Sequence, residues 1–198
     1  MVQKTHEADP LPIVQQPNKV LRKKAVPIDL DDIKSARIQK LIRAMKATLG
    51  RTQNGVGLAA PQVGESLRIF LASEEAETIN DREHLTKNRQ EMDVNEKISR
   101  QWHYYVYINP VVKKISRRLI DDAEGCLSVK DKFGMVKRTE KITVQAYDEH
   151  GKKFIRGASR FFARVLQHEL DHLEGVLFID KAELLDSASH DITQLLSR

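Results

Sequence analysis

Residues 167–175 read QHELDHLEG, and this stretch predicts both a structural element and a chemistry. Because an α-helix turns once every 3.6 residues, His168 and His172 project from one face and their ring nitrogens can converge on one cation. A transition metal held by neutral imidazoles lowers the pKa of bound water, and Glu169 can accept the proton as that water attacks. The stretch therefore predicts a helix that carries the metal site of a hydrolase.

A His-Glu-x-x-His string also arises by chance on surface helices, where it is only a charged and solvated stripe. The flanking residues favour a buried helix instead, because apolar side chains recur at helical spacing. These are Phe161, Phe162, Val165, Leu166, Leu170 and Leu173. Gly175 is placed to cap the end of the helix. Histidines on a core-facing helix need polar partners, and a metal would supply them.

A catalytic metal site needs a third protein ligand and one open position. Phe178 stands where the metzincin pattern has its third His, and it cannot bind a metal. Glu174 and Glu183 offer carboxylates, but both lie close to the motif along the chain. Upstream, Cys126 is the one cysteine of the sequence. A lone cysteine is ordinarily a small buried hydrophobe, but the missing third ligand makes Cys126 the stronger candidate.

Residues 55–64, GVGLAAPQVG, form a glycine-rich segment. Gly55 and Gly57 would allow a positive φ and close approach of a ligand to the backbone, as a substrate lying as an extra strand requires. An ordinary connecting loop is the alternative interpretation. Gln62 favours the functional one, because its side-chain amide can donate a hydrogen bond to an oxygen that becomes negative during hydrolysis.

Three separated motifs together resemble the peptide deformylase family: residues 55–64, residues 124–128 (EGCLS) and residues 167–175. The similarity extends to Leu21-Arg22 and to residues 177–180, and so covers most of the chain outside one insertion. The resemblance implies an enzyme that hydrolyses the formyl group of N-formylmethionyl peptides and releases formate.

The resemblance also implies the roles of the residues within the motifs. It implies a metal bound by Cys126, His168 and His172. Glu169 would take the proton of the attacking water and later protonate the departing amine. Gln62 and the backbone N–H of Leu127 would stabilise the oxyanion.

The substrate-binding residues that we expect on the same basis are Gly55, Val56, Gly57, Glu124, Gly125, Phe161 and Val165. Among them, Val56, Phe161 and Val165 would receive the methionine side chain in an apolar pocket beside His168. Core packing is an equally open interpretation for these three apolar residues.

Imidazole and thiolate ligands suit zinc, ferrous iron, cobalt or nickel, and affinity alone would favour zinc over iron. The resemblance implies Fe²⁺ in the native enzyme, replaceable by Zn²⁺, Ni²⁺ or Co²⁺. Metal-bound imidazoles usually donate their other N–H to a carboxylate or a carbonyl. Asp171 and Glu124 are candidate acceptors, and Arg138 could pair with Glu124, although all three could also be solvated charges.

Two other functions compete with deformylation. Another metalloamidase or peptidase could use the same ligands, and Gln62 with Gly55 and Gly57 argues against it. A noncatalytic, metal-stabilised binding protein would not need Glu169, and it would close its coordination with a fourth protein ligand.

The composition agrees with a small enzyme. A length of 198 residues predicts a single catalytic domain, residues 1–198, and we expect a monomer. One cysteine cannot form an internal disulfide, and a thiolate ligand needs a reducing compartment, so we expect the cytoplasm. Residues 1–9 lack a signal segment, and no run is apolar enough to cross a membrane.

The net charge of +5 allows the hypothesis of a transient contact with ribosomal RNA, although the sequence favours ordinary solubilising charge as its explanation. The sequence contains no basic run with interleaved aromatic residues, so we expect no DNA binding. Formylmethionyl peptides are the expected partners.

The hydrophobic pattern predicts an α+β fold, with mixed or antiparallel β-sheets around a central metal-binding helix and with N- and C-terminal helices. After the helix that carries the metal motif, we expect a short strand. The other predicted elements are a helix over 31–49 ended by Gly50, strands over 67–72, 105–115, 142–147 and 153–155, a turn over 148–151, and a C-terminal helix over about 183–196.

Three features depart from the family pattern. A charged insertion occupies about 74–102 and is long for a structureless loop. Lys130 stands where many members have proline, and Arg160 stands where a glycine commonly precedes the metal helix. These differences concern the rim of the cleft and peptide selectivity. In addition, Asp122 is unusually polar for a pocket wall.

Overall fold

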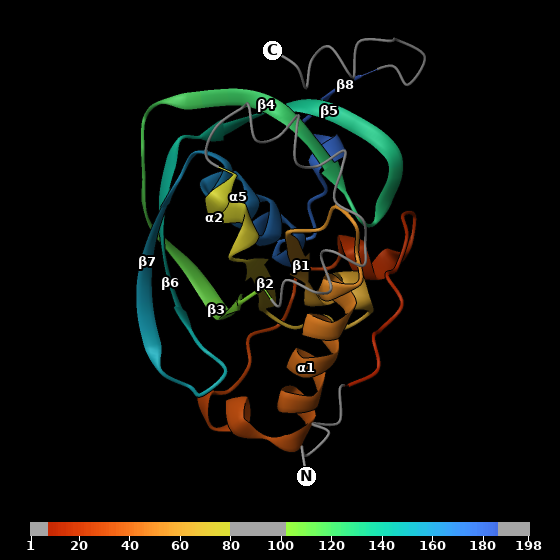
Figure 1. Ribbon diagram of the computed structural model, residues 1–198, viewed down its shortest axis with the longest axis vertical. Helices are drawn as coiled ribbons and strands as arrows, with labels where there is room; N and C mark the ends of the chain where they lie inside the picture. Colours follow the sequence, from red (N-terminus) through yellow and green to blue (C-terminus); the bar gives the residue numbers. More distant parts are fainter. Residues whose placement is uncertain (1–7, 80–101, 186–198) are drawn as a thin grey trace.

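A computed structural model describes residues 8–79 and 102–185 of the chain (Figure 1). The helices are α1 (Ala36–Gly50), α2 (Glu75–Thr78) and α5 (Arg160–Leu173), with short 3₁₀ turns η1 (Lys19–Arg22), η2 (Leu30–Lys34), η3 (Ala60–Val63) and η4 (Phe178–Asp180). The strands are β1 (Gly57–Ala59), β2 (Ile69–Ser73), β3 (Tyr104–Ile115), β4 (Leu119–Cys126), β5 (Val129–Thr139), β6 (Lys141–Tyr147), β7 (Lys153–Ser159) and β8 (Glu183–Leu184).

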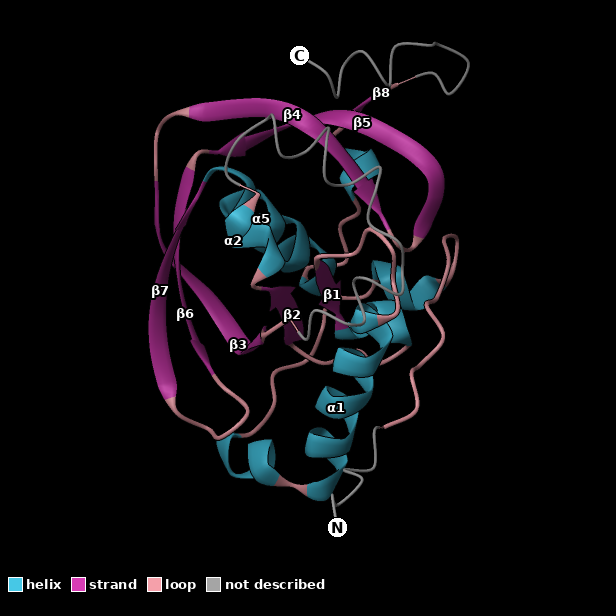
Figure 2. Cartoon of the chain, viewed as in Figure 1, coloured by secondary structure: helices cyan, strands magenta, loops and turns pink. Residues whose placement is uncertain are grey.

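The strands form two antiparallel sheets, one with the order β1-β2-β3-β6-β7 and one with the order β4-β5-β8. Figure 2 shows α5 lying between them, with α1 outside, beyond β1 and β2. The predicted combination of helices with antiparallel sheets is confirmed. Of the two alternatives for the sheets, antiparallel pairing holds throughout the named strands.

Helix α5 is the predicted amphipathic helix. Its apolar side packs into a core formed with β2, β3, β6 and α2, and Ala163 and Leu166 are fully buried there. The helix ends as predicted at Gly175, whose φ of 74° a glycine adopts without steric cost. Arg160, at the start of the helix, has a φ of 54°, a conformation that explains why a glycine would be favoured at this position.

Helix α1 confirms the N-terminal helix. The Ser35 hydroxyl accepts a hydrogen bond from the Ile38 N–H at 3.4 Å and so caps the first turn. The predicted apolar stripe is buried against β1, β2 and β3 in a second core cluster. The segment before it, Leu30–Lys34, forms the separate 3₁₀ turn η2.

The predicted strands correspond to β2, β3, β6 and β7, and the turn over 148–151 is confirmed. There, the Asp148 carboxylate accepts hydrogen bonds from the N–H groups of His150 and Lys152 at 2.9 and 2.8 Å. The sequence pattern missed the β4–β5 hairpin, because its strands read LIDDAEGC and VKDKFGMVKRT and bury only a minority of their residues. This hairpin carries Cys126 at the end of β4.

The prediction of a helix from residue 183 is wrong at its start, because Glu183 and Leu184 form β8 by pairing with β5. The rest of that predicted helix, 186–196, lies outside the described residues. Most of the charged insertion, 80–101, also lies outside them, and its first residues form α2. Among the described residues, no helix combines the length and the apolar character needed to cross a bilayer.

Residues 11–16, which we call the N-terminal strap, connect parts of the molecule that are far apart in sequence. Leu11 N–H donates to the Thr48 hydroxyl of α1 at 2.7 Å. Val14 N–H donates to the Gln62 carbonyl at 2.8 Å, and Gln16 N–H donates to the Ser128 carbonyl at 2.9 Å. The strap therefore holds the first and second motifs side by side.

Candidate metal centre and pocket

The predicted ligands Cys126, His168 and His172 come together between β4 and α5. One ligand atom from each lies within 4.8 Å of the other two, and Cys126 Sγ is 3.3 Å from His172 Nε2. Sulfur and nitrogen ligands around one tetrahedral zinc-sized ion stand about 3.5 Å apart, given metal–ligand bonds of about 2.3 and 2.0 Å. The donor set and its spacing therefore fit a divalent transition metal.

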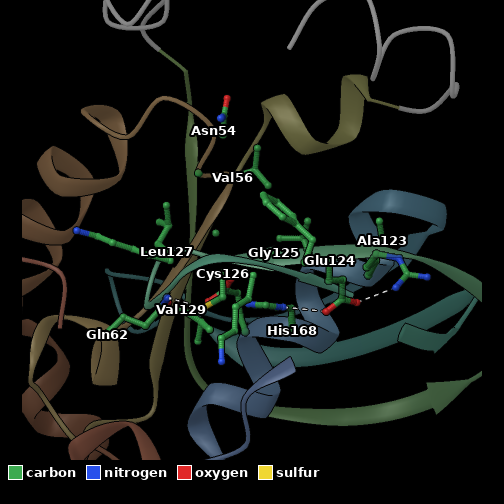
Figure 3. Close-up of a pocket in the computed structure, with 18 of the residues that line it drawn as sticks. Asn54, Val56, Gln62, Ala123, Glu124, Gly125, Cys126, Leu127, Val129 and His168 are labelled. Atoms are coloured by element: carbon green, nitrogen blue, oxygen red, sulfur yellow. Dashed lines mark hydrogen bonds and ion pairs between the residues drawn. The ribbon is translucent and has the colours of Figure 1, made fainter. Parts of the chain in front are cut away.

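Glu124 orients the first histidine. Its carboxylate lies 2.9 Å from His168 Nδ1 (Figure 3), which leaves Nε2 free to face the cation position. The same carboxylate accepts two hydrogen bonds from Arg138, both at 2.9 Å. Burial alone would raise the pKa of Glu124, but the hydrogen bonds from Arg138 and His168 hold it well below its usual range. Glu124 is thus an ionised acceptor for the imidazole.

The two imidazoles differ in their electrostatic surroundings. Burial alone would lower the pKa of His168, but hydrogen bonds to Cys126 and Glu124 raise it well above its usual range. Burial and the neighbouring His168 lower the pKa of His172 well below its usual range. His172 is therefore neutral and can offer a lone pair to a cation, while the acidic groups around His168 favour a positive charge at the same place.

Asp171, the other candidate acceptor, does not contact either imidazole. It accepts a hydrogen bond from Arg138 at 2.5 Å, and it forms an ion pair with Lys181 at 2.7 Å. Asp171 therefore supports the metal ligands only indirectly, because it binds Arg138, and Arg138 binds Glu124. The prediction that Arg138 pairs with Glu124 is confirmed.

Arg164 is a residue that sequence reasoning missed. Its guanidinium is buried and donates to Glu124 Oε1 at 2.7 Å, and also to the backbone carbonyls of Val136 and Ile120, both at 2.8 Å. It thereby ties α5 to both long strands of the hairpin that carries Cys126. A signal was present, because Arg164 precedes His168 by four residues and so shares the helical face of the two histidines.

Glu169 belongs to α5, and its carboxylate packs against Gly57 of β1. Only 3% of the residue is exposed. Burial raises the pKa of Glu169 to about 7, and its Oε2 finds no hydrogen-bond donor among the described residues. A carboxylate with a pKa near neutrality can both accept and return a proton. This is the property that an acid/base residue needs.

Gly55 and Gly57 of the first motif serve close packing, and the expected positive φ is wrong for both of them. A Cβ on residue 57 would overlap the carboxylate of Glu169. A Cβ on residue 55 would stand 2.9 Å from Leu127 Cδ1. Gly57 therefore makes room for the acid/base candidate, and Gly55 lets the first motif approach the second.

Gln62 is held in one orientation by both ends of its amide. Its Oε1 accepts a hydrogen bond from the Ala59 N–H at 2.8 Å. Its Nε2 donates to the Ser128 hydroxyl at 3.3 Å and contacts Cys126 Sγ at 3.6 Å. The amide N–H₂ group therefore faces the ligand set, and Ser128 is a contributor that the sequence did not identify.

A pocket of about 270 Å³ opens onto these residues. Its wall contains every predicted site residue except His172, namely Gly55, Val56, Gly57, Gln62, Glu124, Gly125, Cys126, Leu127, Phe161, Val165, His168 and Glu169. Figure 3 shows Val56 and Leu127 near the Cys126 strand, with His168 below it. Asp122, which was noted as polar for a pocket wall, is outside the lining, and Ala123 takes that place.

Comparisons with known proteins agree with this geometry. The family model of polypeptide deformylases matches residues 10–188. Peptide deformylase 2 of a Nostoc species is 38% identical over 173 residues, which cover 87% of this chain and 86% of the relative. Peptide deformylase 1A, chloroplastic/mitochondrial, of Arabidopsis thaliana is 38% identical over 182 residues, which cover 90% of this chain.

This chain spans 64% of the length of that Arabidopsis relative and 58% of the length of peptide deformylase 1B, chloroplastic, of Solanum lycopersicum. Among solved structures, the Met-Ala-Ser-bound class I type b peptide deformylase of Acinetobacter baumannii has a TM-score of 0.71 and 30% identity, covering 88% of this chain and 99% of that one. A plant peptide deformylase has a TM-score of 0.71 and 32% identity, covering 95% and 88%. The chain therefore belongs to the polypeptide deformylase family.

Proposed function

We propose that this chain removes the N-formyl group from N-formylmethionyl nascent peptides and releases formate. The observation that carries the proposal is the convergence of Cys126, His168 and His172 at the pocket, whose wall includes the first two together with Glu169 and Gln62. Family membership supports the same reaction. The bound Met-Ala-Ser peptide in the Acinetobacter structure supports the substrate class.

Cys126, His168 and His172 would hold the metal, and α5 would thus be the central metal-binding helix of the fold. We propose Fe²⁺ as the native ion, replaceable by Zn²⁺, Ni²⁺ or Co²⁺. When bound, such an ion makes water nucleophilic near neutral pH and polarises a carbonyl group. The thiolate and the two imidazoles leave one coordination position for this chemistry.

Glu169 would move the proton. Its carboxylate takes a proton from the attacking water and then gives a proton to the nitrogen of the departing amine. The buried position of this side chain, next to Gly57, keeps bulk water from competing for that proton. Its pKa of about 7 suits both directions of transfer.

Gln62 and the backbone N–H of Leu127 would stabilise the oxygen that becomes negative as the formyl carbon turns tetrahedral. The hydrogen bond from Ala59 fixes the Gln62 amide before substrate arrives. The strap contributes to the same pre-organisation, since Gln15 Nε2 donates to the Leu127 carbonyl at 3.0 Å.

The methionine side chain would occupy the apolar part of the pocket beside Val56, Phe161 and Val165. Gly55 and Gly57 on one side, with Glu124 and Gly125 on the other, would flank a substrate backbone that lies as an extra strand. Glu124 is bonded to Arg138, Arg164 and His168, so its side chain would act on the substrate through His168.

We further propose one catalytic domain over residues 1–198, a monomeric state, and a reducing compartment that keeps Cys126 as a thiol or thiolate. The cytoplasm remains our prediction for the compartment, although plant relatives are named as chloroplastic or mitochondrial. A transient contact with the ribosome, where formylated peptides emerge, is part of the same proposal.

The experiment is formate release from formyl-Met-Ala-Ser after anaerobic loading with Fe²⁺, Zn²⁺, Ni²⁺ or Co²⁺ in turn. We expect activity that is highest with Fe²⁺, and we expect Glu169→Ala to keep its metal while losing about 10²- to 10⁴-fold in rate. Acetyl-Met-Ala-Ser is the control for a broader amidase. Absence of formate release with every metal would refute the proposed reaction.

A further inference from the structure

The first residues of β5 form the mouth of the pocket. Lys130, Asp131, Lys132 and Phe133 are all exposed, and all line the same cavity as Cys126 and His168. They come just after the second motif in the sequence. Strand β4 ends at Cys126, at the deep end of the pocket, and the chain then runs back past the pocket entrance as β5. We call Lys130, Asp131 and Lys132 the charged rim.

The charges of the rim do not cancel. Two lysines face one aspartate, and within residues 8–79 and 102–185 none of the three forms an ion pair. The charged groups deeper in the pocket are arranged differently, because Glu124 there is bonded to Arg138 and Arg164. The rim therefore presents an uncompensated positive charge to whatever passes the entrance.

A peptide substrate has to cross this rim. The formyl end must reach the deep end of the pocket, at Cys126 and His168, and a volume of about 270 Å³ is at the small end for ligand sites. The cavity can enclose little more than the first residue of a peptide. The side chains that follow leave through the mouth and come within range of Lys130 and Lys132.

We propose that Lys130 and Lys132 make the enzyme favour formylated peptides with Asp or Glu in the positions just after the first two residues. The inference rests on the proposed deformylase function and specifies its substrate class. Ordinary solubilising lysines would have no such effect. Both lysines line the pocket and have no acidic partner within the described ranges, and the position on the pocket wall distinguishes them from the other exposed lysines of those ranges.

The expected effect is modest, because the rim is exposed to solvent. Contacts between exposed opposite charges are weak, so two cations should give about a two- to tenfold preference in kcat/KM. The preference should act through KM, since a rim contact is equal in the ground and transition states. It should also shrink at high ionic strength, because salt screens exposed charges.

The test compares formyl-Met-Ala-Glu-Glu, formyl-Met-Ala-Gln-Gln and formyl-Met-Ala-Lys-Lys with the metal-loaded enzyme at low and high salt. The ratio of kcat/KM for the Glu to the Lys peptide should fall below one in the double variant Lys130→Met, Lys132→Met, because Asp131 is then the one charge left on the rim. It should fall further in Lys130→Glu, Lys132→Glu. Lys137→Met is the matched control, because Lys137 is exposed on the same strand but outside the pocket lining.

A ratio of one in the unaltered enzyme, or a ratio that the double variant leaves unchanged, would overturn the rim inference. In both cases formate release from the Gln-Gln peptide would leave the proposed function standing. If the Gln-Gln peptide released no formate, the proposed function would fall, and the inference would fall with it.

Discussion

Glu124, at the deep end of the pocket, is 7% exposed and accepts hydrogen bonds from Arg138, Arg164 and His168. The charged rim at the mouth is exposed and forms no ion pair with any residue that the structure describes. A buried charge that loses its partner pays the full desolvation penalty, and an exposed charge does not. The comparison suggests that the deep end is built to hold one geometry. The mouth can vary in charge at little cost to the fold.

The largest expected effect is a loss of protein stability when a buried ion pair at the deep end of the pocket is removed. Arg164→Met removes one of the two buried arginine partners of Glu124 and leaves the Val136 and Ile120 carbonyls without the Arg164 donor. We expect the free energy of unfolding in urea to fall by about 3–5 kcal/mol. Arg22→Met is the control, since its ion pair with Asp180 is exposed and should contribute less than about 1 kcal/mol. Equal losses would contradict the contrast.

Gly57→Ala should lower the rate of formate release, because it displaces Glu169. The added methyl group would displace the carboxylate, and a misplacement of this kind can cost about 100-fold in rate. Gly157→Ala is the matched control, because a Cβ at that position meets nothing within 4 Å. Formate release by both variants, with unfolding curves to check the fold, measures the effect. Full activity of Gly57→Ala would mean that Glu169 does not need its present position.

Glu124→Gln and Asp171→Asn separate direct from indirect support of the metal ligands. Glu124 contacts His168, so its change should weaken metal affinity about 10- to 100-fold in competition with a chelator. Asp171 reaches the site only through Arg138, and its change should weaken affinity less. Similar losses in both variants would show that the network acts as one unit.

The last expected effect concerns the pH dependence of stability in the metal-free protein. The pKa of Glu169 is about 7 in the fold, against an ordinary value of 4.5. Between these values the unfolded chain releases the proton and the folded chain keeps it, so the free energy of unfolding falls as pH rises. Above about pH 7 the loss is complete, on the order of 3 kcal/mol. Glu169→Gln should lack this fall, and identical pH curves for the two proteins would contradict the assignment.

Much of this architecture was readable from the sequence because it depends on local patterns. The spacing of apolar residues located α1 and α5, and alternation located β6. The β4–β5 hairpin escaped detection because its strands bury only a minority of their residues, and because β4 carries acidic side chains and β5 carries both acidic and basic ones. Strands of this kind are defined by their pairing partner, which a sequence window does not contain.

The site was predictable to the extent that its residues lie within motifs. The ligand candidates, Glu169 and Gln62 could be named because each has a chemistry that its neighbours in sequence support. Arg164 was missed although it shares the helical face of the histidines, because two of its partners are the carbonyls of Ile120 and Val136, which lie 44 and 28 residues away and carry no sequence signature. The glycines were noticed for a conformational reason, but they act through the space they leave for Glu169 and Leu127.

The N-terminal strap sets a limit on when the molecule can work. A chain is made from its amino terminus, yet the strap residue Gln15 finds its partner Leu127 only 112 residues later. The two histidine ligands follow later still, on α5. Until that helix has been added, a growing chain holds unconnected parts of the site. Under the proposed function, a formylated peptide that emerges during that interval can be deformylated only by protein molecules whose synthesis is already complete.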